Sequence, residues 1–512
     1  MSSGNTIRAI IIFVTGILLA LFLGIGIVTD QTMTLIKFIV VGGLLFCAML
    51  GHRIWLLLLF MSAMNIPLIR GFSTIQLGQM LFLGFGLLLL LMRRLPTNFR
   101  MGETEWWRLL IGICVVQVYV RNPVGLDMFG ASSVGGKAYF ICSLAFISSW
   151  LFGALKVQPR ELKWAMNLHL LATFIGIPIG EARNRSGVNT IQSSEIGAAP
   201  TLSEVGQATR VGFLGSIGVT LSRWISSLVH PLKACFHPFW LPLILISMAC
   251  AAGSGFRNSL AMVAFTYMVG LAYRGGLASI LLAFLLGSLG IATLSFVNLF
   301  APLPANIQRA LTPFPGTWEQ RHKDDAKNSD EWRLEMWREA LLSDRWIQNK
   351  WLGDGLGMSK LELERARDLD SRKVHEGISG ISVHQENAMA SGDYHGGPVQ
   401  TVRIVGYVGL AILLMAMYRN AVHAHRLMMR CKGTEWYNMA LYFTIPTIVN
   451  PLMFTFVFGE FEKAAAGLFM TGALIQIFHN SVPLPPYRKI QRDSYILTKQ
   501  RSQKEPHTNG QS

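Results

Sequence analysis

The chain has 512 residues, of which 51% are hydrophobic and only 14% are charged, and its formal net charge is +16. A composition this apolar excludes an ordinary soluble protein. The positive charge does not indicate a nucleic-acid partner, because much of the excess of bases stands in loops between apolar runs on one side, as membrane topology requires.

Apolar runs of the length that a bilayer demands of a helix recur along most of the chain. They lie near residues 8–28, 33–50, 54–68, 76–92, 106–120, 139–155, 164–180, 211–229, 238–253, 258–273, 277–300, 401–418, 438–458 and 463–480. Such runs cross membranes as helices, because a helix satisfies every backbone polar group within the segment. The sequence therefore predicts an all-α polytopic membrane protein with about 12–14 transmembrane helices.

The runs divide the chain into four regions. Residues 1–300 form a transmembrane region of about 11 spans, residues 301–400 form one long loop, residues 401–480 hold the last transmembrane helices, and residues 481–512 form a basic tail. Lys and Arg gather in alternate short loops and in the tail, which predicts that those loops and both termini are cytoplasmic. The tail has the composition of a disordered segment. The long loop is then expected on the periplasmic side, and the basic loops are expected to contact membrane lipids.

The long loop holds 16 of the 29 acidic residues of the chain. Between Asp330 and Leu342 its apolar residues follow helical spacing, which predicts an amphipathic helix. Tryptophans in and after this stretch suit a helix that lies at the bilayer surface. The turn Gly353-Asp-Gly-Leu-Gly357 follows the helix and ends the pattern.

The sequence gives no sign of a metal site or another cofactor. Its six cysteines stand mainly in apolar runs, without a CxxC pair, and the long loop has none. Neither zinc nor a disulfide framework is expected.

Charged groups at the membrane level are expected to be basic. None of the expected spans contains Asp or Glu, which weighs against a proton- or cation-coupled transporter. The groups at or inside span ends are Lys37, His169, Arg223, Arg257 and Arg403. A charge at depth normally faces a partner, and a lipid phosphate or diphosphate suits the planar fork of arginine.

For each arginine a structural interpretation stands beside the functional one. Arg257 lies among glycines and small polar residues, which favours a cavity, but an arginine at a span end also extends outward to the interface. Arg210 precedes another span on the same side. Arg223 can simply mark a span drawn too long. Arg333 and Arg338 belong to the amphipathic helix, where charges either bind substrate or form a solvated face.

His395 stands a few residues before the span at 401–418. Taken alone, it is an exposed loop histidine. At an outer membrane surface, however, a group that titrates near neutral pH is also placed to act as a general base on a hydroxyl.

In combination, these residues resemble the O-antigen ligase and polymerase superfamily of bacterial membrane proteins. The stretch from Arg333 through Trp337 to Ala340, followed by Gly353, Gly355 and Gly357, is similar to the family's Arg/Trp/Ala and Gly-x-Gly-x-Gly pattern. Ser254-Gly-Phe-Arg257 is similar to the Ser-Arg that the family has at the start of an earlier span, although Gly255 and Phe256 separate the two residues here.

The histidine completes the resemblance. His395, Gly406 and Gly409 reproduce the spacing of the family's histidine and of two glycines at the start of the next span. The residue after the histidine departs from the pattern, since the family often has Asn where this chain has Gly396.

The resemblance implies a metal-independent membrane glycosyltransferase at the periplasmic face of the bacterial inner (cytoplasmic) membrane. Its donor would be an undecaprenyl-diphosphate-linked glycan, and its acceptor lipid A core, a protein or a second lipid-linked glycan. His395 would activate the acceptor hydroxyl, and Arg257 would stabilise the leaving diphosphate. Arg210, Arg333 and Arg338 would bind the substrate. Ligase and polymerase share these motifs and remain open.

Two other classes stay in view. A polysaccharide flippase or other transporter predicts symmetry-related halves, of which the sequence shows no sign. A non-catalytic scaffold for polysaccharide assembly predicts that His395 is dispensable.

Overall fold

The computed structural model describes residues 43, 46–66, 72–125, 135–185, 211–357, 389, 392 and 394–484, and of residues 181–185 it describes the backbone alone. These residues form helices and no strand, as expected of an all-α polytopic membrane protein. The expected span at 8–28, most of that at 33–50, and the tail beyond residue 484 lie outside the described residues.

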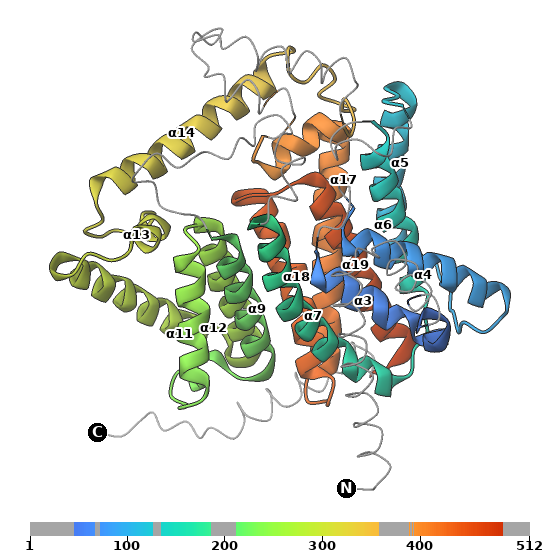
Figure 1. The fold of residues 1–512 in the computed structure, drawn as a ribbon, viewed down its shortest axis with the longest axis horizontal. Helices are drawn as coiled ribbons and strands as arrows, with labels where there is room; N and C mark the ends of the chain where they lie inside the picture. Colours follow the sequence, from blue (N-terminus) through green and yellow to red (C-terminus); the bar gives the residue numbers. More distant parts are fainter. Residues whose placement is uncertain are drawn as a thin grey trace, which may run out of the picture.

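The helices follow the apolar runs closely (Figure 1). They are α3 (Ile54–Met64), α4 (Thr74–Leu91), α5 (Glu103–Arg121), α6 (Lys137–Gly153), α7 (Pro159–Arg185), α9 (Gly212–Leu228), α10 (Pro231–Ala234), α11 (Trp240–Gly253), α12 (Arg257–Phe300), α13 (Ala305–Leu311), α14 (Gln320–Leu342), α17 (Gly397–Cys431), α18 (Tyr437–Phe456) and α19 (Phe461–Ser481). A short 3-10 helix, η1 (Gly51–Arg53), precedes α3.

Seven segments of the described chain are long and apolar enough to cross a membrane. They are Phe46–Met64, Thr74–Leu91, Pro159–Gly180, Arg257–Phe300, Gly397–Cys431, Tyr437–Phe456 and Phe461–Ser481. The apolar helices α6 and α11 are shorter. The multi-pass architecture is thus confirmed, while the total of about 12–14 spans stays a prediction.

The runs at 258–273 and 277–300 are two helical segments, which α12 joins at a kink. Gly276, at φ 70° and ψ −166°, bends the helix at the break that separated the two runs in the sequence. Glycine adopts this conformation without a steric penalty, so the chain turns there without a loop.

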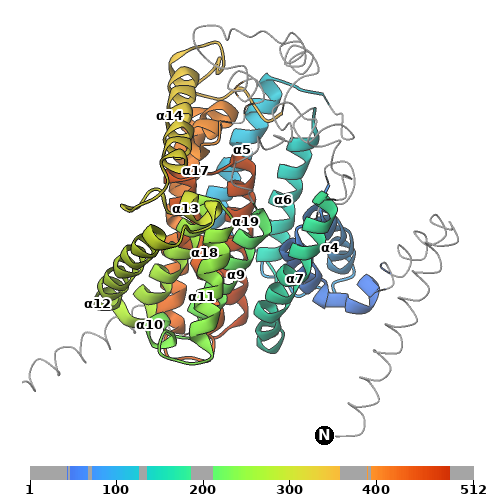
Figure 2. The ribbon, with the colours of Figure 1, turned by 60° about the vertical axis from the view of Figure 1, so that its left-hand side comes forward.

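The second half of α12 leaves the helix bundle (Figures 1 and 2). Its apolar side chains are exposed on all sides, among them Leu277 at 71%, Phe284 at 75% and Phe300 at 76%. A helix that is apolar all round is stable in apolar surroundings, and the lipid of a membrane provides them.

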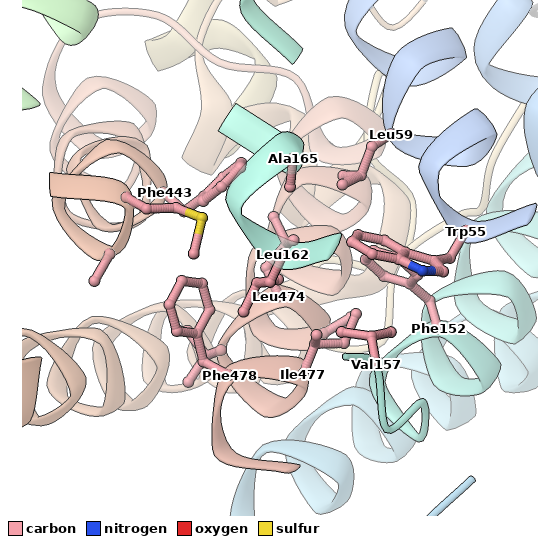
Figure 3. Packing of buried hydrophobic residues seen from close by; sticks show 14 of the residues in the cluster. Trp55, Leu59, Phe152, Val157, Leu162, Ala165, Phe443, Leu474, Ile477 and Phe478 are labelled. Atoms are coloured by element: carbon pink, nitrogen blue, oxygen red, sulfur yellow. The ribbon is translucent and has the colours of Figure 1, made fainter. Parts of the chain in front are cut away.

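The core of the bundle lies where α3, α6, α7, α18 and α19 meet (Figure 3). Trp55 of α3 packs against Phe152 of α6 with ring centroids 6.3 Å apart, and both side chains are completely buried. Leu162 of α7 and Phe478 of α19 belong to the same cluster. Dispersion contacts between close-packed side chains hold such helices together, since lipid removes most of the hydrophobic driving force.

Glu105 is a buried carboxylate that the sequence did not predict. Helix α5 begins at Glu103, three residues before the expected span, and its Glu105 is only 2% exposed. Arg108 donates from Nη2 to Glu105 Oε1 at 2.5 Å and to Gln476 Oε1 at 2.6 Å. A buried carboxylate therefore exists, but an arginine on the same helix neutralises it.

The amphipathic helix expected between Asp330 and Leu342 is present as the last part of α14, which begins ten residues earlier at Gln320. It lies along the upper edge of the molecule in Figure 1 and contacts α13 and the start of α17. We call this the α14 end of the bundle. It carries the residues that the sequence marked for chemistry.

Candidate functional site

The glycine-rich turn after α14 packs against a break in α17. Gly406 has φ 73° in the middle of α17, and Gly353 has φ 81° in the turn. A Cβ on Gly406 would overlap the carbonyl of Trp351, and one on Gly353 would overlap the carbonyl of Ile404. Both positions require glycine, because the two backbones touch where each adopts a positive φ.

Backbone and side-chain hydrogen bonds fix this junction. Asp354 N donates to Arg403 O at 2.6 Å, and the Asp354 carboxylate accepts from the N–H groups of Gln348 and Asn349 at 2.8 Å each. Arg121, at the end of α5, donates to Gly353 O at 2.6 Å. The turn thereby sets the direction in which α17 enters the bundle.

The other two glycines of the turn also have positive φ. Gly355, at 117°, passes the hydroxyl of Tyr139, where a Cβ would lie 2.5 Å from the oxygen. Leu356 N donates to the same hydroxyl at 2.9 Å, and Gly357 follows at φ 76°. All three glycines thus shape the loop, and none presents a side chain for chemistry.

His395 is held between aromatic rings just before α17. Its backbone has φ 48°, a conformation uncommon outside glycine. The imidazole lies 5.6 Å from the Trp332 ring of α14 and 6.3 Å from the Phe458 ring, both between centroids, and it stacks on Phe458 with an interplanar angle of 29°. The ring therefore has a defined orientation and is half-buried.

Trp337 holds the segment that carries His395. Its Nε1 donates to Tyr394 O at 2.6 Å, and Tyr394 is completely buried. Burial raises the pKa of the Tyr394 hydroxyl to about 12, so it stays neutral. A Cβ on Gly396 would lie 2.7 Å from the Trp337 ring. Position 396 therefore has no room for a larger side chain, because the Trp337 ring occupies the space.

Arg257 and Arg333 share one carboxylate. Arg257, the first residue of α12, donates from Nη1 and Nη2 to the two carboxylate oxygens of Asp330 at 2.8 Å each. Arg333 reaches the same carboxylate from the next turn of α14, with Nη1 at 3.4 Å from Oδ1. Two guanidinium groups against one carboxylate leave a net positive charge at this point.

The electrostatics of Arg333 reflect this excess of charge. Burial and then the charge of Arg257 lower the pKa of its guanidinium, and Asp330 opposes the shift. Its Nε is buried and has no hydrogen-bond partner in the described part of the chain. Trp332, which contacts His395, precedes Arg333 on α14, so the histidine and the arginine pair lie against the same segment of that helix.

The remaining expected site residues lie elsewhere. Arg338 is exposed on α14, and five residues of helical rotation turn it away from Arg333. Arg210 lies outside the described residues, although the adjacent Val211 N donates to Ser254 O at 3.0 Å, close to the start of α12. The structure thus brings Arg257 and Arg333 together at Asp330, places His395 against Trp332 of the same helix, and leaves Arg338 exposed.

Arg223 does not mark the end of a span, because α9 continues five residues beyond it. Its Nε donates to Tyr442 O at 2.7 Å, and its guanidinium lies 3.9 Å from the centroid of the Tyr442 ring. Pro446, four residues further along α18, has no N–H to offer that carbonyl. Arg223 replaces the missing helix hydrogen bond, and His169 Nδ1 completes the group at 3.0 Å from the Tyr442 hydroxyl.

A cavity of about 200 Å³ adjoins the site between α12, α17, α18 and α19. Phe458, which stacks on His395, lines it, and so does Asn258, which follows Arg257. Among the described residues, no group of three or more His, Cys, Asp or Glu side chains is arranged to hold a metal ion.

Sequence reasoning missed two members of the site. Asp330 stands three residues before Arg333, a spacing that places both on one face of a helix and offered a signal. Phe458 belongs to the connection between α18 and α19, and no local pattern connects it with His395.

No known protein family and no curated protein matches this chain. The likeness to O-antigen ligases and polymerases therefore rests on the motif residues described above.

Proposed function

We propose that this protein is a membrane glycosyltransferase of the O-antigen ligase and polymerase type, which transfers or polymerises an undecaprenyl-diphosphate-linked glycan. The observation that carries the proposal is the junction of α12 and α14, where Arg257 and Arg333 share Asp330, and where Trp332, the residue before Arg333, contacts His395. The α14 end would be the periplasmic face of a bacterial inner membrane, with both termini in the cytoplasm.

The arginines would stabilise the leaving group. When the bond between the sugar and the lipid diphosphate breaks, negative charge develops on the bridging oxygen. Arg257 and Arg333 keep unused N–H donors beside Asp330, and the first turn of α12 adds the positive end of its helix dipole. Preorganised positive charge of this kind lowers the barrier because it is already in place when the charge forms.

His395 would activate the acceptor. Its imidazole takes the proton of an acceptor hydroxyl while that oxygen attacks the anomeric carbon, and undecaprenyl diphosphate leaves with the electron pair of the broken bond. Histidine is the side chain that most often serves as a general base in enzymes. A single displacement of this kind inverts the configuration at the transferred sugar.

Reconstitution tests the proposal. Purified protein is placed in vesicles with a lipid-linked glycan and, in separate reactions, lipid A core, a candidate protein acceptor or a second lipid-linked glycan. We expect one acceptor to receive the glycan, with or without a chelator of divalent ions. His395→Ala should abolish transfer, and His237→Ala, at an exposed histidine outside the site, should not. Full transfer by the His395→Ala protein would refute the assignment.

A further inference from the structure

The cavity beside His395 follows α19 from its first turn toward its middle. Glu460, just before α19, lines one end and Thr471 lines the other. Eleven residues of helix separate the two, so the cavity extends for roughly 16 Å along the bundle. Met262, Met453 and Phe454 form part of its apolar wall.

Two amide oxygens of the lining have no hydrogen-bond partner in the described part of the chain. Asn420 is only 2% exposed and donates from Nδ2 to Thr471 Oγ1 at 2.9 Å, but its Oδ1 accepts from no described group. Asn258 Oδ1, in the first turn of α12, likewise accepts a hydrogen bond from no described group. A buried acceptor left without a donor is costly, by about 1–3 kcal/mol in general.

A backbone carbonyl adds a third acceptor. Pro451 in α18 has no N–H, so the helix cannot satisfy the carbonyl of Thr447, four residues earlier. Thr447 and Pro451 both line the cavity. The lining therefore offers three acceptor oxygens without a described donor, beside the side-chain amides of Asn258 and Asn450, which can donate as well as accept.

Such a lining selects the chemistry of its ligand. Hydroxyl groups can donate hydrogen bonds to these oxygens. An ionised phosphate cannot, because its oxygens are acceptors too and the lone pairs would repel one another. The one lining lysine, Lys463, is already paired with Glu460 at 2.8 Å. The unpartnered oxygens thus favour a hydroxyl over a phosphate, and the apolar walls suit the faces of a sugar ring.

We propose that this cavity binds a neutral, hydroxyl-rich group, namely the sugar of the acceptor glycan. That it is the acceptor sugar rests on the proposed function, whereas the preference for hydroxyls rests on the cavity alone. Phe458 forms part of both the cavity lining and the stack on His395, so one aromatic side chain separates the bound sugar from the imidazole. The donor diphosphate stays on the arginine side.

A glycine of the lining provides a test that leaves the fold intact. Gly467 of α19 lines the cavity, and a Cβ built on it meets nothing within 4 Å. Gly467→Leu therefore fills the cavity without a backbone clash. Gly290, on the exposed half of α12, has the same open surroundings, so Gly290→Leu is the matched control.

The measurement is saturation-transfer NMR with methyl β-D-glucoside as the probe, on the full-length protein in phosphatidylcholine nanodiscs. We expect wild type and Gly290→Leu to bind the probe and Gly467→Leu to lose it. Asn420→Leu should bind at least about tenfold more weakly, because one acceptor is gone. Inorganic diphosphate should not compete with the probe.

The outcomes separate this inference from the proposed function. Equal binding by wild type and Gly467→Leu, no binding by wild type, or displacement by diphosphate would overturn it, leaving a cavity filled by water alone. Gly467-dependent binding together with failed transfer to every acceptor would retain the hydroxyl site and reject the glycosyltransferase.

Discussion

Arg257 at the α14 end and Arg223 in the interior of the bundle show two uses of an arginine near a membrane. Arg257 shares Asp330 with Arg333, so positive charge remains in excess where α12 begins. Arg223 donates to the carbonyl that Pro446 leaves without a partner and stacks on the ring of Tyr442. A position inside the bundle therefore does not by itself identify a functional charge, because the interior Arg223 already has a structural role.

The largest effect is expected from removing the excess charge at the α14 end. Arg257→Gln should lower the transfer rate by about 10²–10³, because loss of one preorganised donor exposes the developing charge. Arg257→Lys should restore only part of the rate, since an ammonium cannot bond both oxygens of Asp330 as a planar fork. The initial rate of transfer in vesicles measures both, with the exposed Arg160→Gln as control.

The interior arginine should affect stability instead of transfer. Arg223→Gln leaves the Tyr442 carbonyl without its donor, which should cost about 1–3 kcal/mol and lower the thermal unfolding temperature. The transfer rate per folded molecule should stay at the wild-type level. A large loss of rate in well-folded Arg223→Gln protein would contradict the distinction between the two regions.

A double-mutant cycle sharpens this prediction. In the Pro446→Ala background the Tyr442 carbonyl regains its helix hydrogen bond, so Arg223→Gln should cost less there than in the wild-type protein. Unfolding temperatures of the four proteins in detergent give the coupling. An equal cost in both backgrounds would show that Arg223 does not serve that carbonyl.

Gly396→Ala tests the packing behind His395. The new Cβ would lie 2.7 Å from the Trp337 ring, so the ring or the segment must move, at a cost of about 1–3 kcal/mol. We expect a smaller loss of transfer than for Arg257→Gln, together with a change in tryptophan fluorescence. Wild-type rate and fluorescence would mean that Trp337 does not position the histidine.

The smallest expected effect is a pH dependence of the stability of α14. His322 of α14 is 4% exposed, and burial, followed by the charge of Arg321, lowers the pKa of its imidazole. When α14 opens, the His322 imidazole therefore binds a proton more readily than it does in the packed helix. The free energy that keeps α14 packed thus decreases as pH falls through the ordinary histidine pKa of 6.5. Glu319 and Asp325 oppose the shift, and Arg309 adds to it.

Hydrogen exchange locates that effect. Amides of α14 should exchange a few-fold faster at pH 5.5 than at pH 7.5 after correction for the intrinsic pH dependence, and amides of α9 should not. His322→Gln should remove the difference. Equal acceleration in α9 would assign the effect to the whole bundle.

The sequence predicted most helices, because apolar length is a local property that a membrane demands of each span. It also predicted the turn around Gly353, since a cluster of glycines is a local signal, whereas the break at Gly406 was not predicted, because a single glycine at the start of a span does not indicate one. The two helical segments of α12 were predicted as separate runs, and they meet at the kink at Gly276 without a polar loop between them.

Contacts between segments that are far apart in the chain could not be predicted from the sequence. Pro446 is 223 residues from Arg223, and nothing near either residue indicates that one completes the other. The same holds for Phe458 and His395, and for a cavity lined by four helices. Asp330 could have been predicted from the sequence, because its spacing of three residues from Arg333 places both side chains on one face of a helix.

The most direct measurement follows both products of one turnover in vesicles that contain a labelled lipid-linked glycan and an acceptor. The account predicts that each glycan joined to the acceptor releases one undecaprenyl diphosphate, and that His395→Ala abolishes both products together. Movement of intact lipid-linked glycan across the membrane, with no diphosphate released, would contradict the account and indicate a transporter.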